Sequence, residues 1–187
     1  NSYADVYFGL EGYLFPDTYQ FFNDSTIEDI ITKMLDNTNR KLTPYKEIIQ
    51  SSGYTVHQIL TMASIIELEA VTAEDRATVS QVIRSRIKSN MPLGMDVTTY
   101  YAVQKDMSEA LTAADFATVS PYNTRDNINM VAKLPIGPIC NPSVISIEAA
   151  LNPSATDYLF FYADLATGKV YFARTETEFF QLVKELG

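Results

Sequence analysis

Apolar residues recur at helical spacing through the first half of the chain. The first stripe follows an i, i+3, i+4 pattern and consists of Ile27, Ile30, Ile31, Met34 and Leu35. Thr26 and Asp29 supply an approximate capping signal at its start. The pattern predicts an amphipathic helix over residues 27–42, followed by a loop that passes through Pro44 and Gly53.

Two further helices are predicted over residues 55–70 and from residue 72 to about residue 89. The first is apolar on most of its sides, which is typical of a helix packed within a core. The second begins at Thr72 with Asp75 and carries its apolar positions at Val79, Val82, Ile83 and Ile87. A run rich in turn-forming residues at 90–94 ends it.

The second half of the chain mixes short elements with one long irregular segment. Short helices are predicted over 97–104, 113–119 and 146–151, a hairpin over 157–163 and 169–173 with its turn at Thr167 and Gly168, and a last helix capped by Thr175 and Glu178. The opening segment 6–22 reads as a short strand with turns. Residues 120–142 are dense in Pro, Gly and Asn but also apolar, which predicts an ordered, packed binding loop.

These elements predict an α+β fold. We expect a mainly helical domain with a small β-hairpin and a long Pro/Gly/Asn-rich loop at a cleft. With 187 residues, 47% of them hydrophobic, the chain can bury a sizeable core, and a single domain over 1–187 is the simplest organisation.

Charge and cysteine content exclude several classes of function. The chain has 14 basic and 23 acidic residues, a net charge of -9, which argues against binding to the phosphate backbone of nucleic acid. A lone His57 and a lone Cys140 give no cluster for zinc and no evident nucleophile and base pair. We therefore expect no metal and no cofactor, and a structural role for His57.

Glu67 is the candidate for acid chemistry. It projects into the same helical stripe as Val56, Leu60 and Ala63, and no Lys or Arg lies on that stripe. A desolvated carboxyl without a cationic partner has a raised pKa, and one that keeps its proton near neutral pH can protonate a glycosidic leaving oxygen. The alternative is that Glu67 swings to the surface or accepts hydrogen bonds from hydroxyls such as that of Ser64.

Glu69 lies on the far side of the same helix and is expected to be structural or exposed to solvent.

Five sequence blocks, taken together and in order, carry a family resemblance. They are Glu-Gly-Tyr-Leu-Phe-Pro-Asp-Thr-Tyr at 11–19, Ala-Ser-Ile-Ile-Glu-Leu-Glu-Ala at 63–70, Met-Pro-Leu-Gly-Met-Asp at 91–96, Ser-Pro-Tyr-Asn-Thr at 120–124 and Leu-Pro-Ile-Gly-Pro-Ile-Cys-Asn-Pro at 134–142. In these blocks the chain resembles the MltG (YceG-like) family. It departs from that family at Gly94, where Gln is common, at 170–173, which lacks a common His, and at Arg125, where Tyr is common.

The resemblance implies an endolytic murein transglycosylase of the bacterial envelope. Such an enzyme is a lyase that cleaves the bond from N-acetylmuramic acid to N-acetylglucosamine without water and leaves a 1,6-anhydromuramoyl end. The catalytic glutamate of the family falls on Glu67. A single carboxyl can serve both halves of this reaction, first as acid and then as base. A glycan hydrolase and a non-catalytic glycan-binding module remain the alternative functions.

The resemblance also implies substrate-binding residues and partners. Asp96 falls in a cleft-lining block, although it can equally be the N-cap of the helix that follows. Tyr122 can stack on a sugar ring, and Asn123 and Thr124 can donate hydrogen bonds to sugar oxygens, although Asn123 can instead form an Asx-turn. Peptidoglycan glycan strands are the expected partner, with cell-wall synthases besides. The parent protein is expected to be membrane-anchored, with a LysM-like lobe, at the extracytoplasmic face of the membrane, and this portion to be soluble and monomeric.

Overall fold

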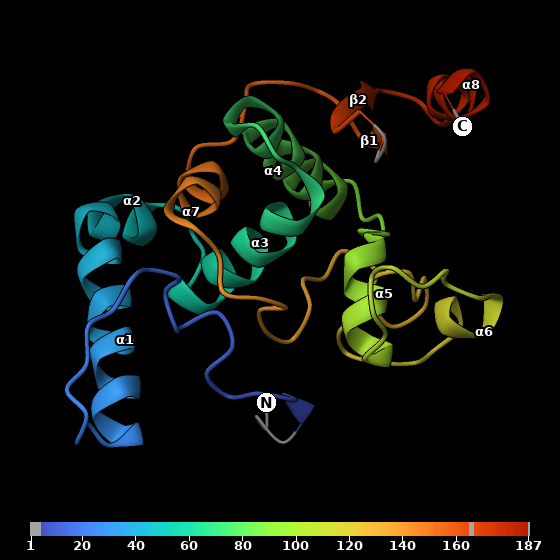
Figure 1. Cartoon of the computed structure of the whole chain (residues 1–187). Helices are drawn as coiled ribbons and strands as arrows, with labels where there is room; N and C mark the ends of the chain where they lie inside the picture. The colour runs from blue at the N-terminus through green and yellow to red at the C-terminus, as the bar shows by residue number, and fades with distance from the viewer. Residues whose placement is uncertain (1–4, 165–166, 187) are drawn as a thin grey trace.

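Three helices in contact with one another form the centre of the fold (Figure 1). The structure is a computed structural model of the chain, and it describes residues 5–164 and 167–186. The three helices are α3 (Val56–Glu69), α4 (Ala73–Lys88) and α7 (Val144–Leu151). Every residue of α3 from Ile59 to Ile66 is buried, because this helix has no polar face to present to water.

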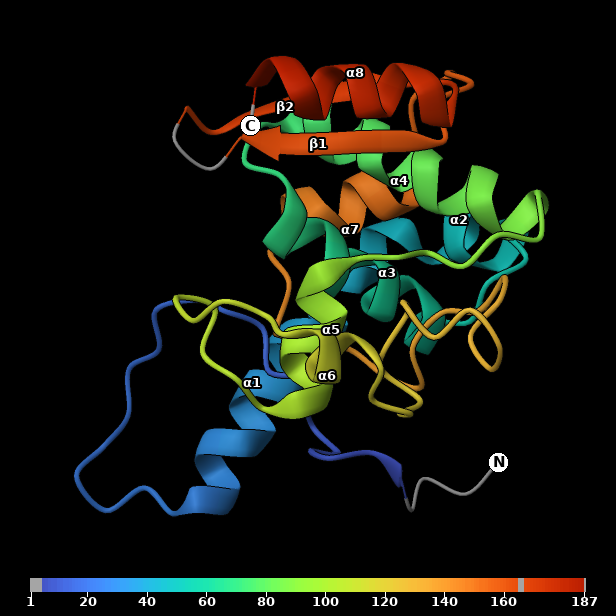
Figure 2. The same cartoon turned by 90° about the vertical axis from the view of Figure 1, so that its right-hand side faces the viewer.

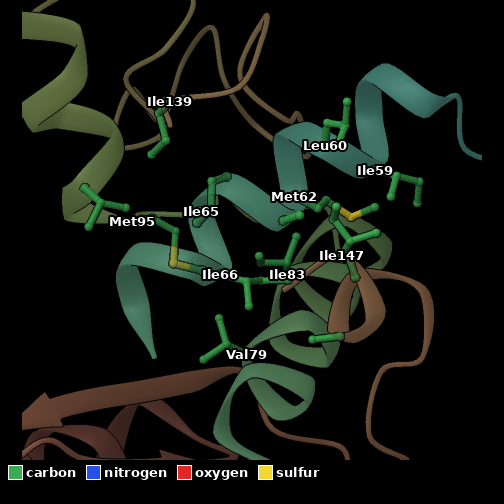
Figure 3. Packing of buried hydrophobic residues seen from close by; sticks show 14 of the residues in the cluster. Ile59, Leu60, Met62, Ile65, Ile66, Val79, Ile83, Met95, Ile139 and Ile147 are labelled. Carbon is green, nitrogen blue, oxygen red and sulfur yellow. The ribbon is translucent and has the colours of Figure 1, made fainter. Parts of the chain in front are cut away.

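The hydrophobic core surrounds α3 (Figure 3). Ile59, Leu60, Met62, Ile65 and Ile66 of α3 are fully buried. They pack with Val79 and Ile83 of α4, Ile147 of α7, and Met95 and Ile139 from the irregular segments. The core therefore fixes the direction of α3, and with it the position of the two glutamates in its last turn.

The N-terminal part lies beside this centre and differs in two places from the sequence prediction. Helix α1 (Ile27–Leu42) has the predicted bounds, and Thr26 with Asp29 forms a full capping box. The predicted loop after it instead holds η2 (Thr43–Tyr45), with Pro44 in its first turn where the missing N–H costs nothing, and α2 (Lys46–Ser51). The strand predicted within 6–22 is wrong, since the described residues of that segment form turns and extended chain.

The third part of the fold is a short helix followed by mostly irregular chain. Helix α5 (Asp96–Val103) packs on α3, and α6 (Ala113–Phe116) packs on α5 and ends earlier than the predicted 113–119. Residues 120–142 contain no helix and one isolated β-bridge, between Pro92 and Val131. The prediction of a long, packed, irregular segment is confirmed here by the burial of residues such as Tyr122 and Ile139.

A small β-layer closes the C-terminal end (Figure 2). Strands β1 (Phe160–Asp164) and β2 (Lys169–Ala173) pair antiparallel, with Phe160 opposite Ala173 and Asp164 opposite Lys169. The hairpin contacts α8 (Glu176–Leu186) and, through β1, α4. Gly168 has a φ of 69° at the predicted turn, a conformation that suits glycine; residues 165–166 of the same connection lie outside the described residues. The α+β, mainly helical class is thus confirmed.

Candidate active site

Glu67 lies in the last turn of α3, where it meets α4 and the start of α7. Its two carboxylate oxygens accept hydrogen bonds from the guanidinium of Arg76, at 3.0 and 3.3 Å. Ser143, the N-cap residue of α7, donates to the same carboxylate from its backbone amide at 2.9 Å and from its hydroxyl at 2.6 Å. The side chain of Glu67 is 24% exposed and that of Arg76 is 11% exposed, so the ion pair is mostly shielded from water.

The predicted environment of Glu67 is therefore wrong. Burial alone would raise the pKa of Glu67, but the hydrogen bonds from Ser143 and the positive charge of Arg76 outweigh it and lower the pKa below its ordinary value. Arg76 does not lie on the helical stripe of Glu67, because it reaches the carboxylate from the next helix, α4. Glu67 is a charged group at neutral pH.

The contacts of Glu67 join three helices. Arg76 of α4 donates from Nε to the carbonyl of Ala70, at the C-terminal end of α3, and from Nη1 to the hydroxyl of Ser143. Glu67 occupies the middle of this arrangement and contacts both partners. Its side chain thus holds the end of α3 against α4 and α7, which is a structural role.

Glu69, the last residue of α3, has the opposite surroundings. It is partly buried and lies near the N-terminal end of α5, where the backbone amide of Val97 hydrogen-bonds its carboxylate. Desolvation by burial, reinforced by the negative charge of Asp96, raises the pKa of Glu69 to about 7, although Arg125 and the Val97 amide act in the other direction. Glu69 is thus not fully exposed to solvent, and of the two glutamates it is the one with the raised pKa.

Asp96 is the first residue of α5 and lies beside Glu69. Its side chain is 48% exposed and forms an ion pair with Arg125 Nε. The N-cap of α5 is Met95, so the alternative reading of Asp96 as an N-cap is wrong. Arg125 in turn lies over the ring of Phe116, 5.0 Å from the ring centroid.

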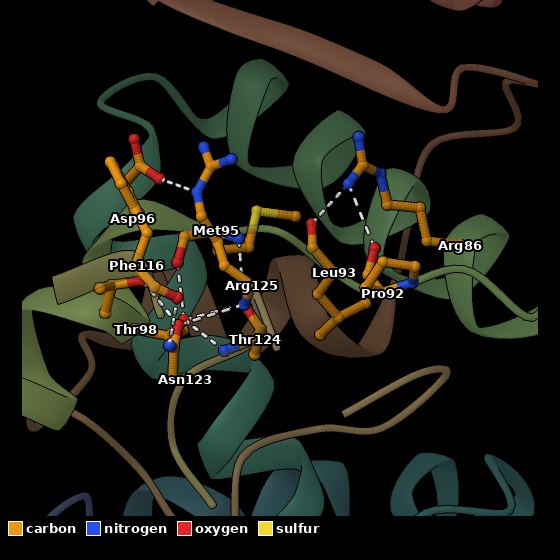
Figure 4. Close-up of polar contacts among 11 residues, drawn as sticks. Arg86, Pro92, Leu93, Met95, Asp96, Thr98, Phe116, Asn123, Thr124 and Arg125 are labelled. Carbon is orange, nitrogen blue, oxygen red and sulfur yellow. Dashed lines mark hydrogen bonds and ion pairs between the residues drawn. The ribbon is translucent and has the colours of Figure 1, made fainter. Parts of the chain in front are cut away.

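Asn123 and Thr124 do not line a surface, contrary to the prediction. Both are fully buried. The amide of Asn123 donates to the carbonyl of Phe116 (Figure 4) and to that of Thr118, and it accepts from the hydroxyl of Thr99 at 2.8 Å. The hydroxyl of Thr124 accepts from the Met95 amide at 3.0 Å and lies 2.8 Å from that of Thr98 (Figure 4).

These buried bonds hold the chain that carries Asp96 and Arg125. The amide of Arg125 itself donates to Asn123 Oδ1 at 3.2 Å. The amide of Gly94, two residues before Asp96, donates to the carbonyl of Thr124 at 3.0 Å. Asn123 and Thr124 thus support the site from beneath rather than contact a ligand.

Tyr122 is also fully buried, so its predicted sugar-stacking face is already occupied. Its ring centroid lies 4.9 Å from that of Tyr7 and 4.8 Å from that of Tyr101. This aromatic cluster joins the N-terminal segment to α5. Tyr122 is a core residue.

Two of the five sequence blocks pack directly on each other. Asn141 accepts through Oδ1 from the amides of Gly12 and Leu14, at 2.8 and 3.1 Å. His57 joins the same two blocks, because Nε2 donates to the carbonyl of Ile136 at 2.7 Å and Nδ1 accepts from the Tyr13 hydroxyl at 2.7 Å. Much of the motif pattern therefore encodes packing, and the structural role expected for His57 is confirmed.

Sequence reasoning did not predict the surroundings of three residues: Glu69, Arg76 and Arg125. For Glu69 a signal was present, since it closes a helix, and the negative end of the helix dipole disfavours a carboxylate there. For Arg76 and Arg125 the sequence offered no local signal, because each reaches its carboxylate from another element.

Among residues 5–164 and 167–186, no group of three or more His, Cys, Asp or Glu side chains is placed to hold a metal ion. Within the same ranges no helix combines the length and apolar character needed to cross a bilayer.

Comparison with known proteins identifies the family. The profile of the YceG-like family matches residues 2–185, and the chain belongs to this family. It is 40% identical to a yceG-like protein of Listeria monocytogenes whose crystal structure superimposes with a TM-score of 0.88, over 96% of this chain and 57% of that one.

Two curated relatives carry the name endolytic murein transglycosylase. The protein of Bacillus subtilis is 43% identical over 170 residues, which is 90% of this chain and 46% of the relative. The protein of Streptococcus pneumoniae is 36% identical over 174 residues, which is 90% of this chain and 31% of the relative. The chain thus spans less than half the length of these curated relatives.

Proposed function

We propose that this chain is the catalytic domain of an endolytic murein transglycosylase and that Glu69 is its general acid. The name shared by the relatives from Bacillus subtilis and Streptococcus pneumoniae supports the activity. The choice of residue rests on the position of Glu69, which is partly buried beside Asp96 at the start of α5; burial and this neighbouring charge raise its pKa to about 7. A carboxyl of this kind can both give and take a proton at neutral pH.

The proposed reaction needs one carboxyl. Glu69 donates its proton to the bridging oxygen as the bond from C1 of N-acetylmuramic acid to that oxygen breaks, and the electron pair leaves with the oxygen. The C6 hydroxyl of the same muramoyl residue then bonds to C1, and the Glu69 carboxylate accepts the proton of that hydroxyl. The acid is restored, no water is consumed, and a 1,6-anhydromuramoyl end is formed.

Glu67 is the poorer candidate for this role. A carboxylate that is bound by Arg76 and by two donors of Ser143 has a lowered pKa and no proton to give at neutral pH. The catalytic role expected for position 67 from the sequence is therefore moved in this proposal to position 69. Asp96 remains a site residue in the proposal, since its charge favours the protonated form of Glu69.

We extend the proposal to location and partners. Murein lies outside the cytoplasmic membrane, so an enzyme that cuts it acts at the extracytoplasmic face and takes part in cell-wall biogenesis. A membrane-anchored parent protein, cell-wall synthases as partners and a monomeric single catalytic domain over 1–187 belong to the same proposal. Membership of the YceG-like family supports these finer points.

The test of the activity is digestion of purified murein followed by mass spectrometry of the product ends. The proposal predicts anhydromuramoyl ends, which are lighter by one water than the reducing ends that a hydrolase would leave. Reducing ends would replace the proposal by a glycan hydrolase. If the murein stays intact, the proposal fails and the chain is a non-catalytic glycan-binding module.

A pair of matched variants tests the choice of residue in the same assay. Glu69→Gln keeps the size of the side chain and removes the titrating proton, so we expect kcat to fall by about 100-fold or more. Glu67→Gln should keep kcat within about threefold in the folded protein, because it removes a structural ion pair. It should instead lower the free energy of unfolding by about 2 kcal/mol. The reverse pattern, with kcat lost only in Glu67→Gln, would contradict the assignment.

A further inference from the structure

Arg125 presents hydrogen-bond donors that no described residue uses, next to the carboxyl of Glu69. Its Nε binds Asp96, and the other four N–H donors of the guanidinium, on the two terminal nitrogens, have no partner within residues 5–164 and 167–186. Figure 4 shows these two nitrogens pointing away from Asp96. The side chain is 42% exposed, so a ligand in solvent can reach it.

The guanidinium is held in place before any ligand arrives. Phe116 lies against its face, with the ring centroid 5.0 Å away, and Asp96 fixes its orientation. The backbone amide of Arg125 is bonded to the buried Asn123. A planar fork in a fixed position loses little side-chain entropy when it binds, and its geometry matches a carboxylate.

The positive charges of Arg125 and its neighbour Arg86 are not fully balanced by the carboxylates around them, so one more anion can be bound. Arg86 lies close enough to Arg125 for their charges to repel, and burial together with this repulsion lowers the pKa of Arg86. Its hydrogen bonds go to the carbonyl oxygens of Pro92 at 3.2 Å and Leu93 at 2.6 Å (Figure 4) and to that of Leu159 at 2.6 Å, and it forms no ion pair with any described residue. Asp96 is thus the carboxylate paired with Arg125, and Arg86 adds a second positive charge nearby that no carboxylate of the described residues pairs with.

We propose that Arg125 binds a carboxylate of the murein substrate through these terminal nitrogens and so positions the glycan strand beside Glu69. This inference rests on the proposed function and adds to it the group of the substrate that is recognised. Murein offers that chemistry from two sources: the carboxylates of the stem peptide, and the lactyl carboxylate of muramic acid where the stem is absent. The neutral N-acetyl and hydroxyl groups of the sugars do not match a cationic fork in this way.

The test is a binding experiment that does not depend on cleavage. Soluble murein oligomers are titrated by calorimetry into protein carrying Glu69→Gln, which resembles the protonated acid and cannot complete the reaction. Three oligomers are used: one with free stem carboxylates, one with these carboxylates amidated, and one with the stems removed. Each is measured with Arg125, with Arg125→Gln and with Arg125→Lys.

We expect Arg125→Gln to raise the Kd of the carboxylate-bearing oligomer about tenfold and to leave the Kd of the amidated oligomer unchanged. Arg125→Lys keeps the positive charge but loses the planar guanidinium, so its Kd for the carboxylate-bearing oligomer should lie between those of Arg125 and Arg125→Gln. A loss with the stem-bearing oligomer assigns a stem carboxylate, because the lactyl carboxyl is bound in an amide there, and a loss with the stem-free oligomer alone assigns the lactyl carboxylate. Arg174→Gln, which removes an exposed arginine paired with Asp157 on another part of the surface, is the matched control and should change no Kd.

Two results would overturn the inference. The first is an equal effect of Arg125→Gln on the free and amidated oligomers, and the second is no effect on any of them. If the wild-type chain cleaves murein but shows either result, only the role of Arg125 fails. If it cleaves none of the oligomers while the Kd pattern holds, the proposed reaction fails and the carboxylate site stands. Thermal unfolding of each variant separates lost binding from lost folding.

Discussion

The two glutamates in the last turn of α3 differ only in what other elements bring to them. Glu67 meets Arg76 and the N-cap of α7, which together stabilise a negative charge. Glu69 meets a second carboxylate, Asp96, in a desolvated position at the end of its own helix. Their pKa values are displaced in opposite directions, so one fits a structural ion pair and the other fits acid and base chemistry.

This difference predicts how stability depends on pH. The raised pKa of Glu69 means that the folded state binds more protons than the unfolded state between pH 4.5 and about 7. The free energy of unfolding therefore falls as pH rises through that window, by on the order of 2 kcal/mol. The lowered pKa of Glu67 acts at a different pH, since its stabilisation is complete above 4.5 and is lost as pH falls below that value.

Urea unfolding at pH 5, 6, 7 and 8 measures the effect. Glu69→Gln should flatten the decline between pH 5 and 8 and should be more stable than wild type at pH 8. Glu47→Gln, on the exposed face of α2, is the matched control and should leave the slope as it is. A decline that is equally steep in Glu69→Gln would show that another group causes it.

At the scale of elements, the site depends on how irregular segments are fixed to the helices. Gly12 has a φ of 85°, and a Cβ at this position would lie 2.3 Å from Pro138. The segment at 11–15 and the loop at 134–142 can therefore approach this closely only because residue 12 is a glycine. The same loop leads into Ser143, the partner of Glu67.

Gly12→Ala should consequently destabilise the protein by about 2 to 4 kcal/mol, from the left-handed backbone and the clash with Pro138 together. Gly9→Ala is the matched control, because nothing lies within 4 Å of its added Cβ and its backbone is not left-handed. The midpoint of denaturant unfolding measures both. Equal midpoints for the two variants would contradict the packing described here.

Most of the helices could be predicted from the sequence because each is marked locally. The stripe at 27–42 has its capping box at Thr26, and the apolar run of α3 has another at Thr55. Helix α2 was missed, because six residues between Pro44 and Gly53 carry too short a pattern. The strand predicted within 6–22 failed because its aromatic residues are used for tertiary contacts such as that of Tyr7 with Tyr122 rather than for a sheet.

The candidate site was predicted less well than the fold. The sequence singled out Glu67 in the last turn of α3 and Asp96 at the start of α5. It favoured Glu67 over Glu69 without the contacts that distinguish the two, because Arg76, Ser143 and Asp96 come from other elements. Tyr122, Asn123 and Thr124 have the side chains of a sugar site, yet the fold uses them to hold the chain that carries Arg125.

For the whole molecule, the net charge and the charges at the candidate site differ in sign. A net charge of -9 gives no long-range attraction to an acidic polymer, so recognition of murein must come from contacts at short range. The ends of α3 and α5 meet beside the three-helix centre, and this junction brings Glu69, Asp96 and Arg125 together. The architecture thus places a carboxyl with a raised pKa and a guanidinium close together in a chain of net negative charge.

The most direct test of this account is a site-resolved titration of the two carboxyl groups by carbon-13 NMR. Assignment uses the Glu67→Gln and Glu69→Gln variants, each of which removes one signal. We predict that the Glu69 carboxyl titrates at about 7 and that the Glu67 carboxyl titrates below 4.5. A Glu69 signal that titrates at 4.5 or below, with the raised value at Glu67 instead, would contradict the account.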